Sequence, residues 1–310
     1  MRMEAAYVKE TARSAGFELC GLAPAASIDD ERRFFERWLA EGRHGSLDYM
    51  SRNVDIRFDP RLMLTGARTV IVCAAACRNE FSEPGVQNAA EVRIASYGLA
   101  EDYHTSIKRM LHRIAGALAD RYPGIRGRLL TDSAPLHEKR WAVQAGLGWI
   151  GRNSLLVTPG YGTFVLLGEI IVDMEADAYD APNDADGCAG CRLCAEGCPA
   201  AALCGDRSVD ARRCISRLTV EAESPDVPVT AGRLHGWIFG CEACQHVCPF
   251  NRRAAPSANP VFAPVAEMDV LTRDYWVNMD AEKFDARFGR TPLARAGMER
   301  LRRNAGVQGG

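Results

Sequence analysis

The chain has 310 residues, of which 47% are hydrophobic and 25% charged, and its formal net charge is −2. These values are those of a globular protein of about two domains, and they give no global attraction to nucleic acid. Charged residues replace the apolar core of a secretory signal at the N-terminus, and no apolar run approaches the roughly 18 residues that span a bilayer, so we expect a cytoplasmic protein without a membrane segment.

Helical and strand patterns alternate through the N-terminal half of the chain. Apolar residues recur at helical spacing over residues 4–15, and Gly16 follows as a stop signal. The apolar run from Val70 to Ala76 predicts a central strand. By the same criteria we expect helices beginning at Ser27 and over 105–121 and 136–145, and strands over 17–22, 127–130, 154–157 and 163–172. The alternation predicts an α/β domain over residues 1–176, in which Cys20, Cys73 and Cys77 serve as small buried hydrophobic residues.

Asp132 follows the predicted strand 127–130 and precedes a helix that starts near Pro135. The end of a strand is where α/β folds place reacting groups, so Asp132 is a candidate catalytic residue. An aspartate in this position can equally cap the following helix. The local pattern alone leaves both interpretations open.

Nine of the twelve cysteines lie between Cys188 and Cys248, and seven of them form two runs. The first run has the C-x2-C-x2-C-x3-C-P spacing of bacterial ferredoxins, in which three thiolates hold one 4Fe-4S cubane and the fourth reaches a second one. The second run lacks one cysteine. The runs are Cys188, Cys191, Cys194 and Cys198 before Pro199, and Cys241, Cys244 and Cys248 before Pro249. We predict a ferredoxin-like domain over residues 177–255.

Two clusters of four ligands require an eighth thiolate, and the candidates between the runs are Cys204 and Cys214. We favour Cys214. The resulting assignment gives cluster one the ligands Cys188, Cys191, Cys194 and Cys248, and cluster two the ligands Cys198, Cys214, Cys241 and Cys244.

Zinc and disulfides are the alternative uses of these cysteines. A structural zinc site needs a single tetrahedral set of four ligands and would not explain two Cys-Pro endings. Disulfides are disfavoured in a reducing cytosol. Iron-sulfur chemistry therefore fits the spacing best.

The C-terminal stretch is basic. Between Ala281 and Asn304 it carries seven Lys or Arg and three Asp or Glu residues. This pattern is typical of a solvated helix, and it also suits a segment that contacts phosphates. We treat residues 256–310 as a short helical tail.

Taken together, these motifs resemble the epoxyqueuosine reductase family, the cobalamin-dependent enzymes of queuosine modification in tRNA. The resemblance covers nearly the whole chain and depends on an ordered set of segments. They are Tyr97 to His104, Asp132 to Pro135 with Glu138 and Lys139, Ala145 to Ser154, Leu167 to Glu169, the first cysteine run, Asp210 to Glu221, and Gly240 to Asn251. One departure is Tyr97-Gly98-Leu99-Ala100, where relatives often have Tyr-Ala-x-Gly. The chain resembles the short form of the family, without a C-terminal helical repeat.

The resemblance implies a nitroreductase-like, cobalamin-binding α/β domain followed by the two-cluster domain. It places Cys214 on a cluster ligand and Asp132 on the proton donor, which we expect to be buried beside the corrin. It places Arg57, Tyr97, Asn153, Leu156 and Ser216 near positions that line the corrinoid. Epoxyqueuosine in a tRNA anticodon loop would then be reduced to queuosine, with electrons delivered by an external low-potential donor such as ferredoxin or flavodoxin. We expect a monomer whose basic C-terminal tail contacts the RNA.

Two other functions remain open at the level of sequence. A related corrinoid and iron-sulfur reductase of a small molecule, similar to reductive dehalogenases, would share both cofactors but would not need a basic RNA-facing segment. A ferredoxin-like electron carrier would need no domain as large as residues 1–187 before its first cluster cysteine.

Overall fold

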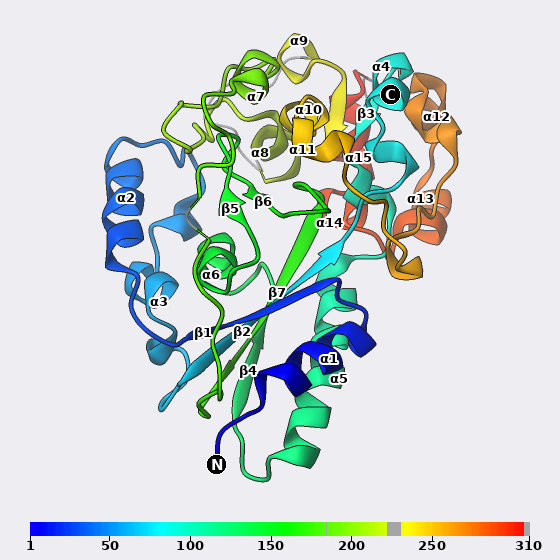
Figure 1. The fold of residues 1–310 in the computed structure, drawn as a ribbon. Coiled ribbons are helices and arrows are strands. Elements are labelled where there is room, and N and C mark those ends of the chain that lie inside the picture. Colours follow the sequence, from blue (N-terminus) through cyan, green and yellow to red (C-terminus); the bar gives the residue numbers. More distant parts are fainter. Residues whose placement is uncertain (184, 222–230, 307–310) are drawn as a thin grey trace.

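A four-stranded antiparallel sheet organises the N-terminal part of the computed structural model, which describes residues 1–183, 185–221 and 231–306 (Figure 1). The strand order is β1-β2-β7-β4. Neighbouring strands pair antiparallel throughout, and Leu130 at the end of β4 lies opposite Glu169 on β7. The strands are β1 (Leu19–Pro24), β2 (Thr69–Ala76), β7 (Val165–Val172) and β4 (Gly127–Leu130).

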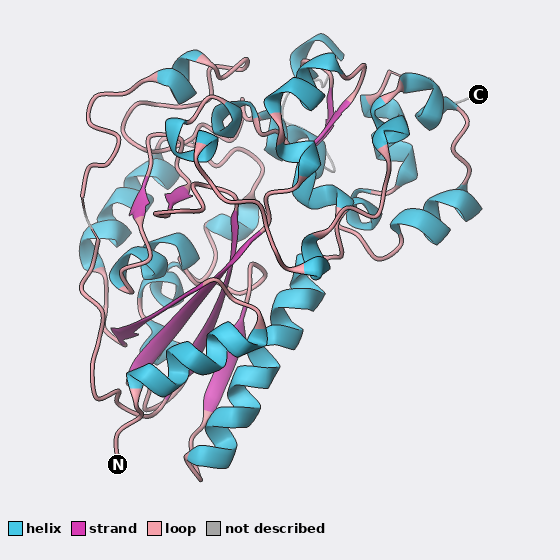
Figure 2. Ribbon diagram, turned by 45° about the vertical axis from the view of Figure 1, so that its right-hand side comes forward, coloured by secondary structure: helices cyan, strands magenta, loops and turns pink. Residues whose placement is uncertain are grey.

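Helices cover both faces of this sheet. Helices α1 (Ala5–Ala15) and α5 (Tyr103–Arg121) lie along one face, and α6 (Glu138–Gln144) lies on the other (Figure 2). Every residue of β2 is buried, with Cys73 in the core beneath α1 and α5 and Val72 in the core beneath α6. This double burial explains why the strand is continuously apolar in sequence. Gly16 ends α1 in the left-handed conformation at φ 106°, as its place after the helical pattern predicted.

The mixed helix and sheet content of the prediction is confirmed, but the sheet is antiparallel. Parallel α/β sheets place reacting groups at the carboxyl ends of their strands, and this antiparallel sheet gives the position of Asp132 after a strand no such meaning. Periodicity identifies strands without revealing their direction, because direction depends on pairing between residues far apart in the chain.

A second core joins three distant parts of the chain. Strand β8 (Trp237–Phe239) pairs in parallel with β3 (Arg93–Ile94), and α8 (Ile215–Val220) packs beside them. The C-terminal segment completes this core with Trp276, Phe288, Leu293 and Leu301, all fully buried. Residues 256–306 therefore do not form a separate tail. Their helices are α12 (Arg273–Val277), α13 (Ala281–Phe288), α14 (Leu293–Ala296) and α15 (Met298–Asn304).

Short elements connect these layers. They are α2 (Asp29–Ala40), α3 (Val54–Phe58), α4 (Pro84–Ala89), β5 (Trp149–Ile150), β6 (Leu156–Val157), α7 (Leu193–Glu196), α9 (Ala231–Leu234), α10 (Ala243–His246) and α11 (Pro249–Arg252), with 3-10 turns at 48–50, 60–62, 80–82, 96–99, 260–262 and 268–271. Within the part of the chain that the structure describes, no helix has both the length and the apolar character needed to cross a bilayer.

Candidate functional site

A cavity of about 510 Å³ lies where the sheet domain, the cysteine region and the C-terminal segment meet. Its lining combines aromatic faces with polar and charged side chains, as in many small-molecule sites. The lining residues are Tyr49, Arg52, Asn53, Arg57, Tyr97, Tyr103, His104, Asp132, Ser133, Ala134, Pro135, Val220, Glu221, Phe239, Pro292 and Arg295. The cavity therefore collects residues that are far apart in sequence.

Asp132 reaches this cavity from the turn that follows β4. Its backbone is left-handed, with φ 53°, and its N–H donates to the carboxylate of Glu138 at the start of α6. The preceding residue is anchored by a hydrogen bond of 2.9 Å from the Thr131 hydroxyl to the Leu167 carbonyl. Asp132 does not cap a helix. In the protein alone the Asp132 side chain is 54% exposed, and its expected burial beside a corrin stays a prediction.

His104 lies between two carboxylates. Its Nε2 is 2.8 Å from Asp132 Oδ2, and its Nδ1 is 2.7 Å from Asp102 Oδ1. With the proton on Asp132, the acid donates to Nε2 of a neutral ring; with the proton on His104, both ring nitrogens donate and the ring carries the charge of an imidazolium. Burial opposes that charge, but the hydrogen bonds to Asp132 and Asp102 outweigh it and raise the pKa of His104 above its ordinary value.

Asp102 is held from three sides. It accepts the His104 side-chain bond, it caps α5 by accepting the backbone N–H of His104 at 3.1 Å, and its other oxygen accepts two bonds of 3.1 and 3.0 Å from Arg295 of α14. Although burial by itself would raise the pKa of Asp102, the hydrogen bonds from His104 and Arg295 lower it overall. The sequence reasoning assigned no role to His104 and did not single out Asp102 or Arg295. The spacing of Asp102 and His104 at the start of a helix was the available local signal.

The predicted corrinoid residues are only partly brought together. Arg57 and Tyr97 line the cavity with Asp132, whereas Asn153, Leu156 and Ser216 are not among its lining residues. Leu156 lies on β6 in the core beneath α6, and buried Asn153 accepts the Leu155 N–H. These three residues stay predictions.

The side chains that line the cavity are chemically suited to contact one face of a large conjugated ring. Tyr97, Tyr103 and Phe239 contribute aromatic surfaces, and the Tyr97 ring centroid lies 5.7 Å from that of Phe239 and 6.0 Å from that of Tyr103. Buried Arg57 donates to the Tyr49 carbonyl at 2.7 Å, and its Nε has no hydrogen-bond partner among the described residues. A ligand with amide side chains could accept from this nitrogen.

The cysteines of the second region fall into two neighbourhoods. The Cys248 thiol interacts electrostatically with Cys188 and Cys191, and the Cys194 thiol with Cys188 and Cys248. The Cys241 and Cys244 thiols interact with Cys214 and Cys198, and Cys244 also with Cys194. The assignment of each cysteine to one of the two clusters stays a prediction, since Cys244 and Cys194 interact across the two neighbourhoods.

Cys204 differs in exposure from the other eight cysteines of this region, which are half-buried. It is exposed, and its Sγ is 3.8 Å from the carbonyl of Ala202, whereas Cys214 caps α8 beside Cys198. The position of Cys214 favours it as the eighth ligand. Across the described ranges, no three His, Cys, Asp or Glu side chains converge as the ligands of a single metal ion. A cubane holds its four thiolates farther apart than one ion does.

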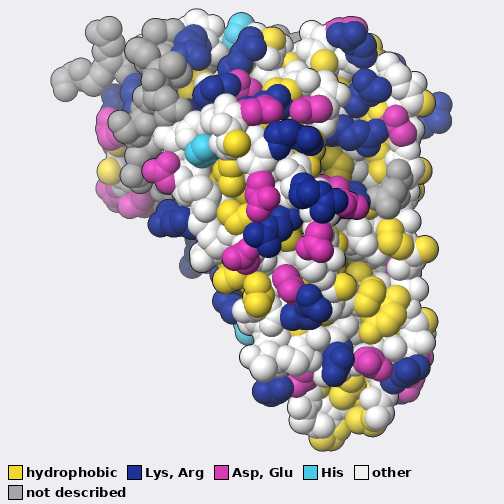
Figure 3. All heavy atoms as spheres, turned by 90° about the vertical axis from the view of Figure 1, so that its left-hand side faces the viewer, with side chains coloured by type: hydrophobic (Ala, Val, Ile, Leu, Met, Phe, Trp, Pro, Cys, Tyr) yellow, Lys and Arg dark blue, Asp and Glu magenta, His cyan; other side chains and the backbone are white. Residues whose placement is uncertain are grey.

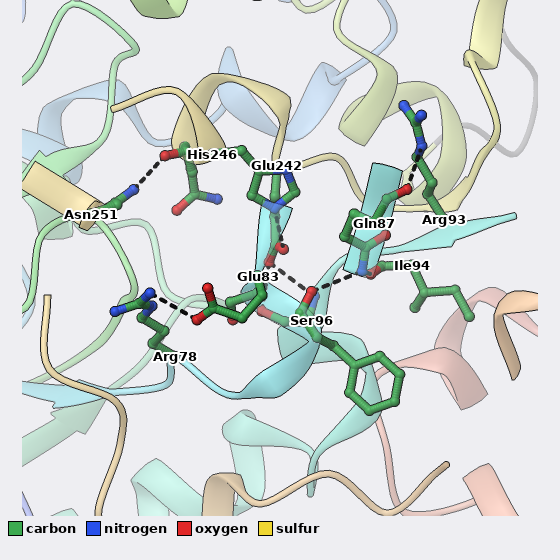
Figure 4. A network of polar contacts seen from close by, with 12 residues as sticks. Arg78, Glu83, Gln87, Arg93, Ile94, Ser96, Glu242, His246 and Asn251 are labelled. Carbon is green, nitrogen blue, oxygen red and sulfur yellow. Dashed lines mark hydrogen bonds and ion pairs between the residues drawn. The ribbon is translucent and has the colours of Figure 1, made fainter. Parts of the chain in front are cut away.

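Two connections link the second cysteine group to the cavity. Phe239 lines the cavity two residues before Cys241, and Val220 lines it at the end of the helix that Cys214 begins. Buried Glu242 adds a third link, because one of its oxygens accepts the Ser96 N–H at 2.9 Å and the Ser96 hydroxyl at 2.8 Å (Figure 4). This contact fixes the turn that carries Tyr97 against the cysteine loop.

Comparisons with known proteins agree with this arrangement. Residues 57–133 match the family described as epoxyqueuosine reductase QueG, and residues 187–251 match the 4Fe-4S double cluster binding domain. Curated relatives named epoxyqueuosine reductase include one from Cyclobacterium marinum, 37% identical over 96% of this chain and 94% of the relative, and one from Gloeobacter violaceus, 36% identical over 98% and 95%.

Solved structures have the same fold. The epoxyqueuosine reductase of Streptococcus thermophilus superposes with a TM-score of 0.82 at 25% identity, covering 97% of this chain and 80% of that one. An epoxyqueuosine reductase crystallised with an epoxyqueuosine-modified tRNA-Tyr stem loop gives 0.83 at 23% identity, with the same coverage of 97% and 80%.

Proposed function

Because the chain belongs to the epoxyqueuosine reductase family, we propose that it reduces the epoxide of epoxyqueuosine in the anticodon loop of a tRNA to the alkene of queuosine. The observation that carries this function is the Asp132, His104 and Asp102 chain at a cavity directly beside the double cluster domain. Family membership favours this activity over a small-molecule dehalogenation and over simple electron carriage.

The reaction consumes two electrons and two protons. Both carbon–oxygen bonds of the epoxide break, a carbon–carbon double bond forms, and the oxygen leaves as water. A bound cobalamin would supply a strongly reducing metal centre for attack on the epoxide carbon. Arg57 and Tyr97 would hold it in the cavity, with Asn153, Leu156 and Ser216 as further predicted contacts.

The protein supplies the proton that the epoxide oxygen needs as its bond to carbon breaks. Asp132 is half-exposed at the cavity and delivers that proton, and the Nε2–H of His104 restores it across 2.8 Å. The negative charge of Asp102 keeps His104 protonated and fixes its ring. The Asp132 and His104 pair thus keeps a transferable proton at a pH where an isolated histidine would largely have lost it.

The predicted ligands of cluster two, Cys214 and Cys241, lie close in the chain to the cavity-lining residues Val220 and Phe239. The bound 4Fe-4S clusters would supply single electrons to the site, and the loop of cluster one would receive them from an external carrier such as ferredoxin or flavodoxin. The loop that holds cluster one exposes Leu193, with 40% of its surface accessible, and the neighbouring Arg192 is also exposed. An apolar contact beside a positive charge suits an acidic carrier protein. We propose that the enzyme acts as a cytoplasmic monomer.

The tRNA would approach the mouth of the cavity. Exposed Arg52 lies there, within reach of a phosphate group. Several basic residues of the C-terminal segment are instead engaged within the protein: Arg295 binds Asp102, and Arg300 donates to the Val220 carbonyl at 2.6 Å. On the face that carries α2, Lys and Arg side chains are interspersed with Asp and Glu (Figure 3). This face is therefore not a continuous patch of positive charge.

The decisive experiment is a single-turnover assay on epoxyqueuosine-containing tRNA with a chemical reductant, with and without cobalamin. We expect conversion only with cobalamin. Asp132→Asn should retain the iron-sulfur absorption and bind cobalamin, yet lose about 10²- to 10⁴-fold in rate, the usual contribution of a general acid. Full activity of this variant would remove Asp132 from the mechanism, and the absence of any conversion by the wild-type protein would refute the function.

A further inference from the structure

Glu169 is a completely buried acid on the central strand β7. It lies between Val72 of β2 and Leu130 of β4, and its side chain points to the apolar face beneath α6, the face that also carries Ile171. Among the described residues, no hydrogen-bond donor reaches either of its carboxyl oxygens. A charge in such a place is strongly disfavoured, which favours the protonated form of Glu169.

The carboxyl group next to it is Glu138. Glu138 opens α6, and one of its oxygens accepts the backbone N–H of Asp132. The side chains of Glu138 and Glu169 are also within hydrogen-bonding reach of each other. Two carboxylates that share a buried site cannot both be ionised, but a protonated one can donate to its ionised neighbour.

We propose that Glu169 is a positioning residue that stays protonated and donates to Glu138, whose carboxylate in turn holds the left-handed backbone of Asp132. This inference rests on the proposed function in one respect, namely that Asp132 is the acid. A non-glycine residue at φ 53° is held in place only by its surroundings, and the Glu138 carboxylate is the group that binds its N–H. Glu169 thus acts on the catalytic acid through two successive hydrogen bonds.

The charged surroundings of the pair support this division of roles. Burial, followed by the charge of Glu138, raises the pKa of Glu169 well above its ordinary value. Burial and the charge of Asp132 raise the pKa of Glu138 to about 7, while the hydrogen bond from Glu169 and the charge of Lys139 lower it. The charge of Asp132 also raises the pKa of Glu169, and Glu169 in turn acts on Cys73 of β2, whose hydrogen bond with Cys20, followed by burial, raises the pKa of that thiol.

The test compares two substitutions of similar size. In Glu169→Gln the amide still donates to Glu138, whereas in Glu169→Met the donor is lost. Without the donor the pKa of Glu138 rises further, so more of it is neutral at pH 7, and a neutral carboxyl group holds the Asp132 N–H more weakly than a carboxylate does. We expect Glu169→Gln to keep the wild-type rate and pH profile. We expect Glu169→Met to lose on the order of 10- to 100-fold, as for a misplaced catalytic group, with the acid limb of its pH profile moved to higher pH.

A second measurement needs neither substrate nor cobalamin. Infrared difference spectra of wild type and Glu169→Gln should show the carbonyl band of a protonated carboxylic acid that persists across neutral pH and is absent in the variant. The proposal is overturned if that band is missing, if it titrates near pH 7, or if Glu169→Gln is as impaired as Glu169→Met. Because this band is independent of turnover, a failure of the proposed enzymatic function would leave it unchanged. The readout also stands if Glu169→Met does not fold.

Discussion

The charge of Asp102 should set the upper pH limit of activity. In Asp102→Asn the new side chain can still cap α5 and accept from His104 Nδ1, but it carries no charge. A hydrogen bond to a charged group contributes about 1.5–3 kcal/mol and a neutral one about 0.5–1.5 kcal/mol. The Asp102 side chain is 18% exposed, so solvent partly screens its charge. We therefore expect the free energy that favours protonated His104 to fall by about 1 kcal/mol, which corresponds to about a fivefold change in the protonation equilibrium of His104.

The direction of the pH effect follows from the sign of the shift. The pKa of His104 is raised in the folded protein, so the imidazolium is fully present at low pH and is lost as pH rises through that pKa. Removing the Asp102 charge lowers the pKa of His104. The alkaline limb of the single-turnover rate should therefore move to lower pH, with about a fivefold lower rate above the limb and little change below it.

Single-turnover rates measured across pH for the wild type and Asp102→Asn test this reasoning. Glu101→Gln is a matched control, because it neutralises a neighbouring acid that pairs with Arg109 instead of His104. Arg295→Met should have a smaller effect than Asp102→Asn, about twofold or less, since the Arg295 side chain is 53% exposed and solvent screens its charge. An unchanged alkaline limb in Asp102→Asn, or a shift to higher pH, would refute the assignment of His104 as the proton source.

Three further outcomes follow from the same structure. Cys214→Ser should lower the iron content from about eight to about four atoms per chain, whereas Cys204→Ser should leave it unchanged, as measured by iron analysis and absorption. Leu193→Asp should slow reduction by ferredoxin or flavodoxin but leave turnover with dithionite intact, and equal slowing with both would argue against a docking role for Leu193. Arg52→Ala should weaken tRNA binding and reduce the slope of log affinity against log salt by about one, and an unchanged slope would show that Arg52 contacts no phosphate.

Local patterns in the sequence predicted a feature correctly where that feature depends on residues close together in the chain. The apolar run of β2, the stop at Gly16 and the cysteine spacing each concern residues within one short segment, and each predicted its element or its type of site. Asp132 is different, because its local pattern left catalysis and helix capping open and the family resemblance indicated its role; the structure places it in the cavity.

Contacts between distant segments were beyond such patterns. His104 meets Asp132 across 28 positions and Asp102 meets Arg295 across 193, and neither pairing leaves a trace in periodicity or spacing. The exposure of the Asp132 side chain in the protein alone was beyond such patterns too, because exposure depends on which segments surround the turn. Glu169 is the clearest example. Its apolar strand is predictable from the sequence, but the role of an acid within that strand depends on its contact with Glu138, which no local pattern shows.

The basic C-terminal segment has two separable effects on activity. It reaches the acid site twice, since the Arg290 carbonyl accepts the Asp102 N–H at 2.8 Å and Arg295 binds the Asp102 carboxylate. Substitutions there can therefore lower activity without any loss of RNA contact. The two causes differ in what they change: loss of a phosphate contact lowers the salt dependence of binding and leaves the pH profile intact. Loosening Asp102 moves the alkaline limb and leaves the salt dependence intact. Measuring both for Arg295→Met and for Arg303→Ala, whose side chain is exposed, assigns each residue to one effect.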